Sequence, residues 1–133
     1  MELMDRHHVK NMTGTLMYKD IPLFDFCIEH ENLIFVREYD RVTNYKYYPA
    51  EFRFDDAVTY GDINDYFKHH VVEDGAQEIY EYLQSLGLHY YDLDEIIKRN
   101  NGYNHMNFIW VRFKNFGACT WNDIKTQRYP VYK

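Results

Sequence analysis

Histidine and cysteine are the residues of this 133-residue chain whose side chains could hold a metal or act as a nucleophile. The pair His69 and His70, close to Asp65, comes nearest to a metal site, but adjacent residues on a helix point in different directions. Neither HExxH nor a cysteine pair with zinc spacing occurs. Cys119 and His105 could form a nucleophile and its base, yet nothing in the local sequence would activate the thiol.

Phosphate-binding and paired-carboxylate chemistry have no stronger signal. The six glycines are spread singly, without a Walker loop or GxGxxG, so none forms a phosphate cradle. The chain has enough acids for a general acid–base pair. However, a solvated helix face is the default explanation for so many acidic residues. We therefore expect no enzyme activity, no cofactor and no metal, and an enzyme of unrecognised type is kept as a third hypothesis.

The acidic residues are concentrated in the middle of the chain. Residues 51–95 hold twelve acids and two bases, a charge of −10, whereas residues 96–133 hold seven bases and one acid, a charge of +6. Either the two regions face each other and partly neutralise, or the acidic segment docks on a basic partner surface. The second interpretation predicts fast, salt-sensitive association. Direct nucleic-acid contact is not expected, because the acidic segment would repel a phosphate backbone.

Two short helices and a strand carry the clearest local signals. Apolar residues at spacings of three and four share one face of a helix, and they are Ala76, Ile79, Tyr80, Leu83 and Leu86. Asp74 suits its N-cap and Gly87 its C-terminal end. A second helix begins at about Leu93, with Asp92 as its cap and Asn100-Asn101-Gly102 as its stop. Residues 106–113 are aromatic and β-branched, which predicts a buried strand.

The first seventy residues predict a β-meander followed by a helix. The expected strands are 13–19, 23–29 and 33–38, joined by turns at Asp20-Ile21-Pro22 and His30-Glu31-Asn32. Residues 39–44 are expected to form a polar loop, and 45–54 an extended aromatic segment that Pro49 interrupts. A short helix is expected at 62–69, with Ile63, Tyr66 and Phe67 facing inward.

These elements predict one α+β domain over residues 1–133: an N-terminal antiparallel β-meander, a cluster of short helices and a late aromatic strand. Hydrophobic residues make up 46% of the chain and aromatics 19%, which is ample for a core. We expect loose ends at 1–11 and 125–133, buried positions for Trp110 and Trp121, and a cytosolic setting for the two free thiols, Cys27 and Cys119. No apolar run is long enough to span a membrane.

Five pieces of the chain follow one another in a distinctive order. They are MYKDIPLFDF (17–26), YLQSLGL (82–88), IIKRNNGY (96–103), NFIWVRF (107–113) and TWND (120–123). This order resembles the N-terminal, non-kinase portion of HipA-like proteins of Firmicutes. No ATP-binding or catalytic kinase motif occurs here, so no phosphotransfer residue carries over. The resemblance implies a free-standing accessory domain that binds a kinase partner.

Two functions are therefore expected. The first is a non-enzymatic inhibitor of a bacterial defence system, of the anti-CRISPR kind found in phages and mobile elements, acting in the host bacterial cytoplasm. An acidic helical face would occupy a basic nucleic-acid-binding groove of its target, and its residues are Asp62, Asp65, Glu73, Asp74, Glu78, Glu81 and Tyr82. The alternative is an accessory or antitoxin-like subunit of a separate HipA-like kinase, with contacts made by the β-meander and by the aromatics near Trp110 and Trp121, so that its affinity would depend little on salt. The partner would be a CRISPR effector nuclease or that kinase.

Overall fold

The computed structural model describes residues 7–53, 56–70, 79–103, 107–113 and 120–126. Its strands are β1 (Met12–Tyr18), β2 (Ile21–Glu29), β3 (Asn32–Glu38) and β4 (Ile109–Phe113). Its helices are α1 (Arg41–Asn44), α2 (Tyr60–His70), α3 (Ile79–Ser85), α4 (Leu93–Asn100) and α5 (Trp121–Thr126), with two 3-10 turns, η1 (Tyr45–Tyr47) and η2 (Ala50–Phe52).

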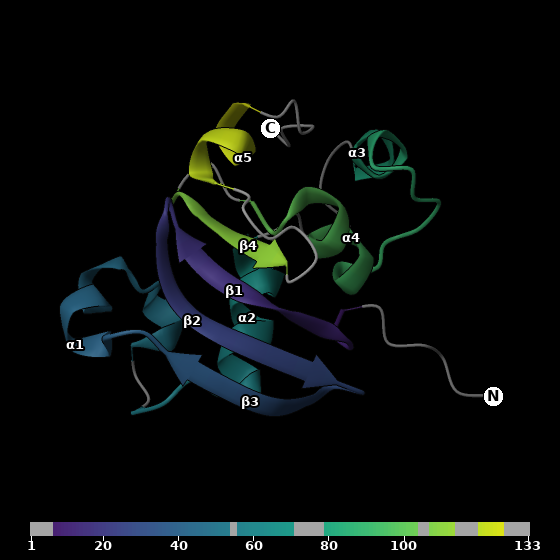
Figure 1. Cartoon of the computed structure of the whole chain (residues 1–133). Helices are drawn as coiled ribbons and strands as arrows, with labels where there is room; N and C mark the ends of the chain where they lie inside the picture. Colours follow the sequence, from purple (N-terminus) through teal and green to yellow (C-terminus); the bar gives the residue numbers. More distant parts are fainter. Residues whose placement is uncertain (1–6, 54–55, 71–78, 104–106, 114–119, 127–133) are drawn as a thin grey trace.

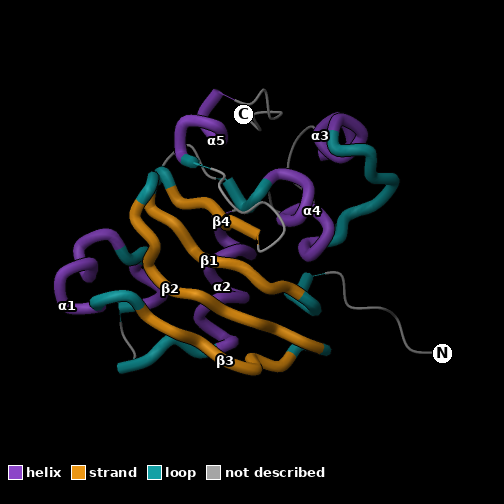
Figure 2. Tube along the Cα trace, in the orientation of Figure 1, coloured by secondary structure: helices purple, strands orange, loops and turns teal. Residues whose placement is uncertain are grey.

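A single antiparallel sheet with the strand order β3-β2-β1-β4 forms one layer, and α2 lies behind it (Figure 1). The predicted α+β class and the N-terminal meander are confirmed, and the late aromatic strand, β4, joins the sheet beside β1. The trace shows α2 crossing behind the strands, while α1 lies beside one end of the sheet and α3, α4 and α5 lie on the β4 side (Figure 2). Within the described residues, no helix combines the length and the apolar character that crossing a membrane requires.

The core lies between α2 and the sheet. Phe24, Phe26 and Ile28 alternate along β2 and are buried, as their period of two predicts. The predicted inner face of α2 is also confirmed, because Ile63, Tyr66 and Phe67 are all buried. A second, smaller cluster joins β1, β4 and α5, and its buried members are Met17, Trp110 and Ile124. Trp110 is thus a core residue as expected, whereas Trp121 is only partly buried.

The turns of the meander are shorter than predicted. The first consists of Lys19 and Asp20, and Ile21 and Pro22 already belong to β2. Pro22 lies next to the β1–β2 register shift between Leu16 and Met17, and it precedes the part of β2 that pairs with β3, which begins at Phe24.

The second turn has an unusual composition for its backbone. It consists of His30 and Glu31, which both have positive φ, 49° and 63°. Two positive φ values are the signature of a type I′ hairpin turn, whose twist matches that of its strands. Side chains other than glycine and asparagine are strained in this region of φ, so the hairpin forms despite its turn residues.

The segment between β3 and α2 differs from the prediction. Instead of a loop at 39–44 and an extended stretch at 45–54, the described residues form α1, η1 and η2. Asp40 begins α1, because its side chain accepts a hydrogen bond from the Thr43 amide. Pro49 separates the two 3-10 turns rather than interrupting a strand. The pattern of alternating aromatics was misleading, because these side chains pack onto the end of the sheet from a helical backbone.

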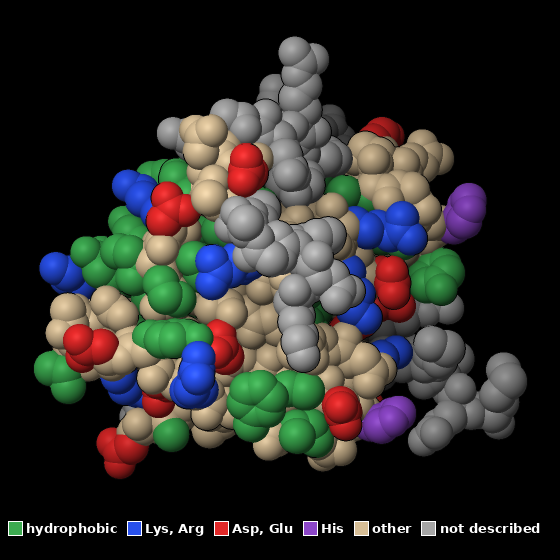
Figure 3. Space-filling model, in the orientation of Figure 1, with side chains coloured by type: hydrophobic (Ala, Val, Ile, Leu, Met, Phe, Trp, Pro, Cys, Tyr) green, Lys and Arg blue, Asp and Glu red, His purple; other side chains and the backbone are tan. Residues whose placement is uncertain are grey.

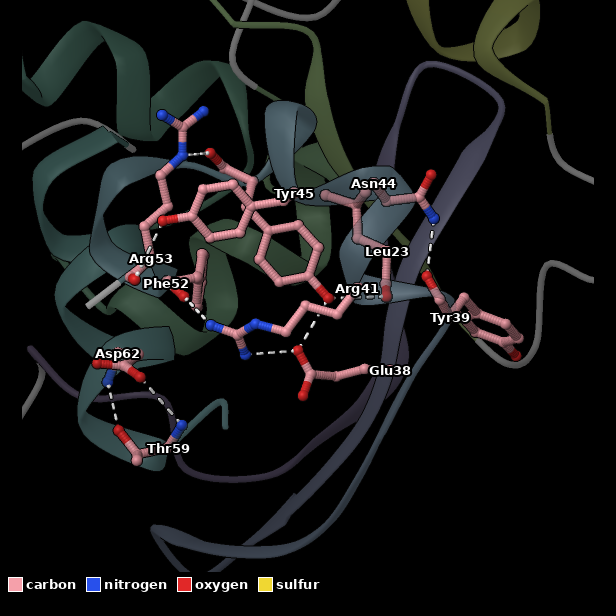
Figure 4. Close-up of polar contacts among 11 residues, drawn as sticks. Leu23, Glu38, Tyr39, Arg41, Asn44, Tyr45, Phe52, Arg53, Thr59 and Asp62 are labelled. Carbon is pink, nitrogen blue, oxygen red and sulfur yellow. Dashed lines mark hydrogen bonds and ion pairs between the residues drawn. The ribbon is translucent and has the colours of Figure 1, made fainter. Parts of the chain in front are cut away.

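A polar network around Arg41 holds this segment in place (Figure 4). The Arg41 guanidinium lies 2.8 Å from Glu38 Oε1 and donates to the Phe52 carbonyl at 2.8 Å. Tyr48 donates to the same Glu38 oxygen at 2.9 Å, and Arg53 Nε donates to the Tyr48 carbonyl. Hydrogen bonds that involve charged groups therefore connect helix α1 and the 3-10 turns η1 and η2 to the end of β3.

The loose end predicted for residues 1–11 does not include its last residues. Val9 is fully buried, and its amide donates to Asn64 Oδ1 at 2.8 Å. The Lys10 amide donates to Asp94 Oδ1 at 2.9 Å. Residues 9–11 therefore tie the start of β1 to α2 and α4. Residues 1–6 and 127–133 lie outside the described part of the chain.

The two edges of the sheet are different. On β4, the Val111 amide donates to the Asn101 carbonyl at 2.7 Å, and Asn101 Nδ2 donates back to the Val111 carbonyl at 3.1 Å. Asn101 thereby occupies both backbone groups of Val111, in the middle of that edge. On β3, the described residues provide backbone bonds only toward β2. Ile34 and Phe35 of β3 are exposed, by 54% and 49%.

Candidate partner-binding surface

Helix α3 is the described part of the predicted acidic helix. Its inward residues Ile79 and Leu83 are buried, as the spacing predicts. Gly87 has a φ of 79°, its amide donates to Gln84, and the Leu88 amide donates to Leu83, which together form a Schellman motif. The predicted stop is therefore confirmed. The predicted cap Asp74 and the first apolar residue Ala76 lie outside the described residues.

Tyr80 does not lie on the inward face of α3. The prediction placed it beside Ile79 and Leu83, but 74% of its surface is exposed. A residue next to Ile79 is rotated by about 100° from it on a helix, so Tyr80 lies at the margin of the apolar face and turns outward. Glu81, the following residue, is exposed as well. The outward side of α3 therefore presents a large aromatic ring next to a carboxylate.

Tyr82 is turned toward α4 instead of toward solvent. Its hydroxyl accepts a hydrogen bond from Asn100 Nδ2 at 2.8 Å. Burial raises the pKa of the Tyr82 phenol, and the Asn100 bond offsets part of that rise. Tyr82 was predicted to contact a partner, but its hydroxyl is engaged within the protein. Its structural contribution is to fix the orientation of α3.

Arg99 makes the second connection between α3 and α4. Its Nη1 donates to the Leu86 carbonyl at 2.9 Å, just past the end of α3, and its Nε lies 3.8 Å from Glu95 Oε2. A cation at the negative end of a helix is stabilising. Helix α4 itself is well defined, because the predicted cap Asp92 accepts from the Glu95 amide and Asn101 ends the helix with a φ of 58°.

The two acids predicted on the preceding helix lie elsewhere. Asp62 and Thr59 cap α2 reciprocally: the Thr59 amide donates to Asp62 Oδ2, and the Asp62 amide donates to Thr59 Oγ1, both at 3.1 Å (Figure 4). Asp65 is exposed on α2. Helix α2 lies behind the sheet, while α3 lies beyond α4 at the upper right (Figure 1). The structure therefore divides the described acids between two helices.

The remaining acids of the prediction are Glu73, Asp74 and Glu78, and all three lie outside the described residues. Elsewhere in the acidic segment, several carboxylates have basic partners. Asp94 Oδ2 lies 2.6 Å from Lys98 Nζ, and Glu51 Oε2 lies 2.8 Å from His70 Nε2. Asp94 is thus paired with a cation, while Glu81 and Asp65 stay at the surface.

The other chemistry considered from the sequence has little geometric support. Within the described ranges, no three His, Cys, Asp or Glu side chains are placed to hold a metal ion. His70 stacks on Tyr66 with ring centroids 4.6 Å apart. Cys27 is buried and accepts a hydrogen bond from Thr13. The proposed pair of Cys119 and His105 lies outside the described residues.

Comparisons with family models, curated proteins and solved structures gave no match for this chain. Its functional assignment therefore rests on the residues themselves. The sequence interpretation missed the anchoring roles of Arg99 and Asn100. The sequence did contain a signal for these roles. Arg99 and Asn100 lie in the last turn of α4, and polar side chains there can reach back across the connecting loop to the preceding helix, α3.

Proposed function

We propose that this chain is a non-enzymatic, protein-binding inhibitor and that the outward side of α3 is its contact surface. The partner that fits is a bacterial defence protein with a basic nucleic-acid-binding groove, such as a CRISPR effector nuclease. The observation that carries the proposal is the exposure of Tyr80, 74%, directly beside the exposed Glu81. Tyrosine is enriched among the residues that dominate binding energy, and an adjacent carboxylate adds complementarity to a basic surface.

The anchoring of α3 supports the same proposal. A seven-residue helix is too short to be stable alone, so its position depends on packing. Ile79 and Leu83 bury its inner side, while the Tyr82–Asn100 and Arg99–Leu86 hydrogen bonds fix its rotation and its end. A pre-positioned surface loses less conformational entropy on binding than a flexible one.

The test is affinity capture from a bacterial lysate that contains CRISPR nucleases and HipA-like kinases, followed by elution with a salt gradient. The proposal expects a nucleic-acid-binding defence protein that is released at modest salt. With the captured protein purified, Tyr80→Ala and Glu81→Lys should each weaken binding by about tenfold or more. The inhibitor should also compete with the partner's nucleic acid.

Glu29→Lys is the matched control, because Glu29 is an exposed acid at the end of β2, away from α3. It makes the same charge change and should leave the affinity nearly unchanged. If Tyr80→Ala and Glu81→Lys bind as tightly as the wild type, α3 is not the contact surface and the proposal fails.

The accessory subunit of a HipA-like kinase stays the alternative. A kinase that remains bound through high salt would favour it over the inhibitor. Of the two tryptophans assigned to that interface, Trp110 is fully buried and only Trp121 has surface to offer. Substituting Trp121 should then weaken capture, whereas Glu81→Lys should not.

A further inference from the structure

Five aromatic side chains form a continuous row at the end of the sheet. They come from four separate parts of the sequence, and in order of ring contact they are Tyr47, Tyr18, Phe108, Trp121 and Tyr103. Neighbouring ring centroids are 4.5, 6.2, 5.8 and 5.7 Å apart along this row. We call this row the aromatic ridge. None of its rings is fully buried, and Phe108 is 39% exposed.

The ridge lies where the β1–β2 turn meets α5. The Trp121 amide donates to Asp20 Oδ1 at 2.7 Å, so α5 begins against that turn. The surface view shows hydrophobic side chains together with basic and acidic ones at the upper left, where Figure 1 places the turn (Figure 3). Partly exposed aromatic rings that touch one another form a contact surface with little side-chain entropy to lose.

Two lysines lie on the ridge. Lys19 Nζ lies 4.8 Å from the centroid of Phe108 and 5.7 Å from that of Tyr18. Lys46 Nζ lies 5.1 Å from the centroid of Tyr47. Both lysines are exposed. The backbone of Lys19 is held in place, since its amide donates to the Phe108 carbonyl at 3.1 Å and its carbonyl accepts from Trp110 Nε1 at 2.8 Å.

We propose that the aromatic ridge binds an extended acidic peptide segment of a partner protein, with apolar side chains against the parts of the rings that the lysines leave uncovered and carboxylates on Lys19 and Lys46. Charge complementarity argues for this occupant, because the cations sit directly on the apolar rings. Two acids lie beside the ridge, and both accept hydrogen bonds at the start of α5: Asp20 from the Trp121 amide and Asp123 from the Thr120 amide. The ring-to-ring steps limit the ridge to about 22 Å, which an extended peptide of about seven residues spans.

Single-stranded nucleic acid is a less suitable occupant. Base stacking needs open ring faces, but ammonium groups already lie over Phe108 and Tyr47. The ridge is distinct from the outward side of α3, and the proposal does not depend on the one made for that helix.

The test measures fluorescence anisotropy of a labelled peptide of alternating glutamate and leucine, titrated with the full chain. The wild type should bind it, and the double change Lys19→Glu with Lys46→Glu should weaken binding by about tenfold or more. Phe108→Gly should also weaken it, and glycine tolerates the φ of 63° at that position. Lys68→Glu, on α2 behind the sheet, is the matched control and should change little. Circular dichroism confirms that each variant is folded.

Three results would overturn the proposal. The first is no binding of the acidic peptide to the wild type. The second is equal binding by the ridge variants and the Lys68→Glu control. The third is tighter binding of a lysine–leucine peptide or of oligothymidine than of the acidic peptide. Glu81→Lys should leave peptide binding intact, so failure of the α3 surface is distinguishable from failure of the ridge.

Discussion

At Gly14, the absence of a side chain lets β1 and β4 approach each other closely. A Cβ atom there would lie 2.9 Å from both the Arg112 carbonyl oxygen and Val111 Cγ1. Because the first of these is backbone, the two strands would have to separate. We expect Gly14→Ala to lower the free energy of unfolding by about 1–3 kcal/mol, measured by urea denaturation.

Gly61 provides the comparison for that measurement. It is exposed near the start of α2, and a Cβ there would meet only Thr59 Oγ1 at 3.8 Å. Gly61→Ala should therefore be neutral or stabilising by up to about 1 kcal/mol, through helix propensity. Equal losses for the two variants would contradict the steric explanation.

Two buried phenols make stability depend on pH in the alkaline range. Burial raises the pKa of Tyr48, with a further rise from its hydrogen bond to Glu38, and burial also raises the pKa of Tyr66. The folded state keeps these protons when the unfolded chain loses them, so their contribution is complete below about pH 10 and falls as the pH rises above it.

We therefore expect the free energy of unfolding to decline above about pH 10, and Tyr66→Phe to reduce the slope of that decline. The measurement is urea denaturation across the alkaline range. Tyr80→Phe, which changes an exposed phenol, is the control. If the free energy of unfolding declines with pH as steeply in Tyr66→Phe as in the wild type, the Tyr66 phenol does not contribute to the pH dependence of stability.

At the scale of elements, substitutions in the turn of the β2–β3 hairpin should raise the stability of the protein. His30 and Glu31 both occupy positive φ, where asparagine and glycine are favoured. Replacing them by His30→Asn with Glu31→Gly should stabilise the protein by about 1 kcal/mol or more, because the strain at both positions is relieved. Thermal unfolding would check it, and a lower melting temperature would contradict the turn assignment.

The elements that sequence reasoning predicted well are those with both an apolar period and an end signal. Asp92 and Gly87 fixed the ends of α4 and α3, and the alternation in β2 gave its buried face. The segment 39–53 was predicted wrongly, because its short helical turns carry no apolar period of their own. Their position depends on Arg41 and Glu38, a contact that no local pattern encodes.

The candidate surfaces were less predictable than the elements. Net charge indicated the acidic segment, but not that Tyr82 turns inward while Tyr80 turns outward, since both lie at the margins of a short apolar face. The aromatic ridge could not be read from the sequence at all, because Tyr18, Tyr47 and Trp121 come together only through tertiary packing.

At the scale of the whole molecule, Asp94 joins the start of the chain to its helices. It is 5% exposed, accepts from the Lys10 amide at 2.9 Å and the Asn11 amide at 3.3 Å, and pairs with Lys98. Removing it leaves two backbone donors without their acceptor. We expect Asp94→Ala to cost about 2–3 kcal/mol of stability in urea denaturation.

Glu95→Ala is the matched control for that change, since it removes the neighbouring acid of the same helix. Its ion pair with Arg99 is exposed and 3.8 Å long, so the loss should stay within about 0.5 kcal/mol. Similar losses for both variants would show that general charge effects, rather than the connection to residues 10 and 11, determine the result.

The unequal edges of the sheet limit how copies of this chain could polymerise. Head-to-tail strand addition would pair β3 of one copy with β4 of the next, and Asn101 already occupies the backbone groups of Val111 in the middle of β4. Among the described strands, pairing β3 with β3 requires no such bond to break, and that contact uses the open edge of both copies. Self-association through the native sheet would therefore stop at a closed pair, and fibre growth would require β4 first to be released from Asn101.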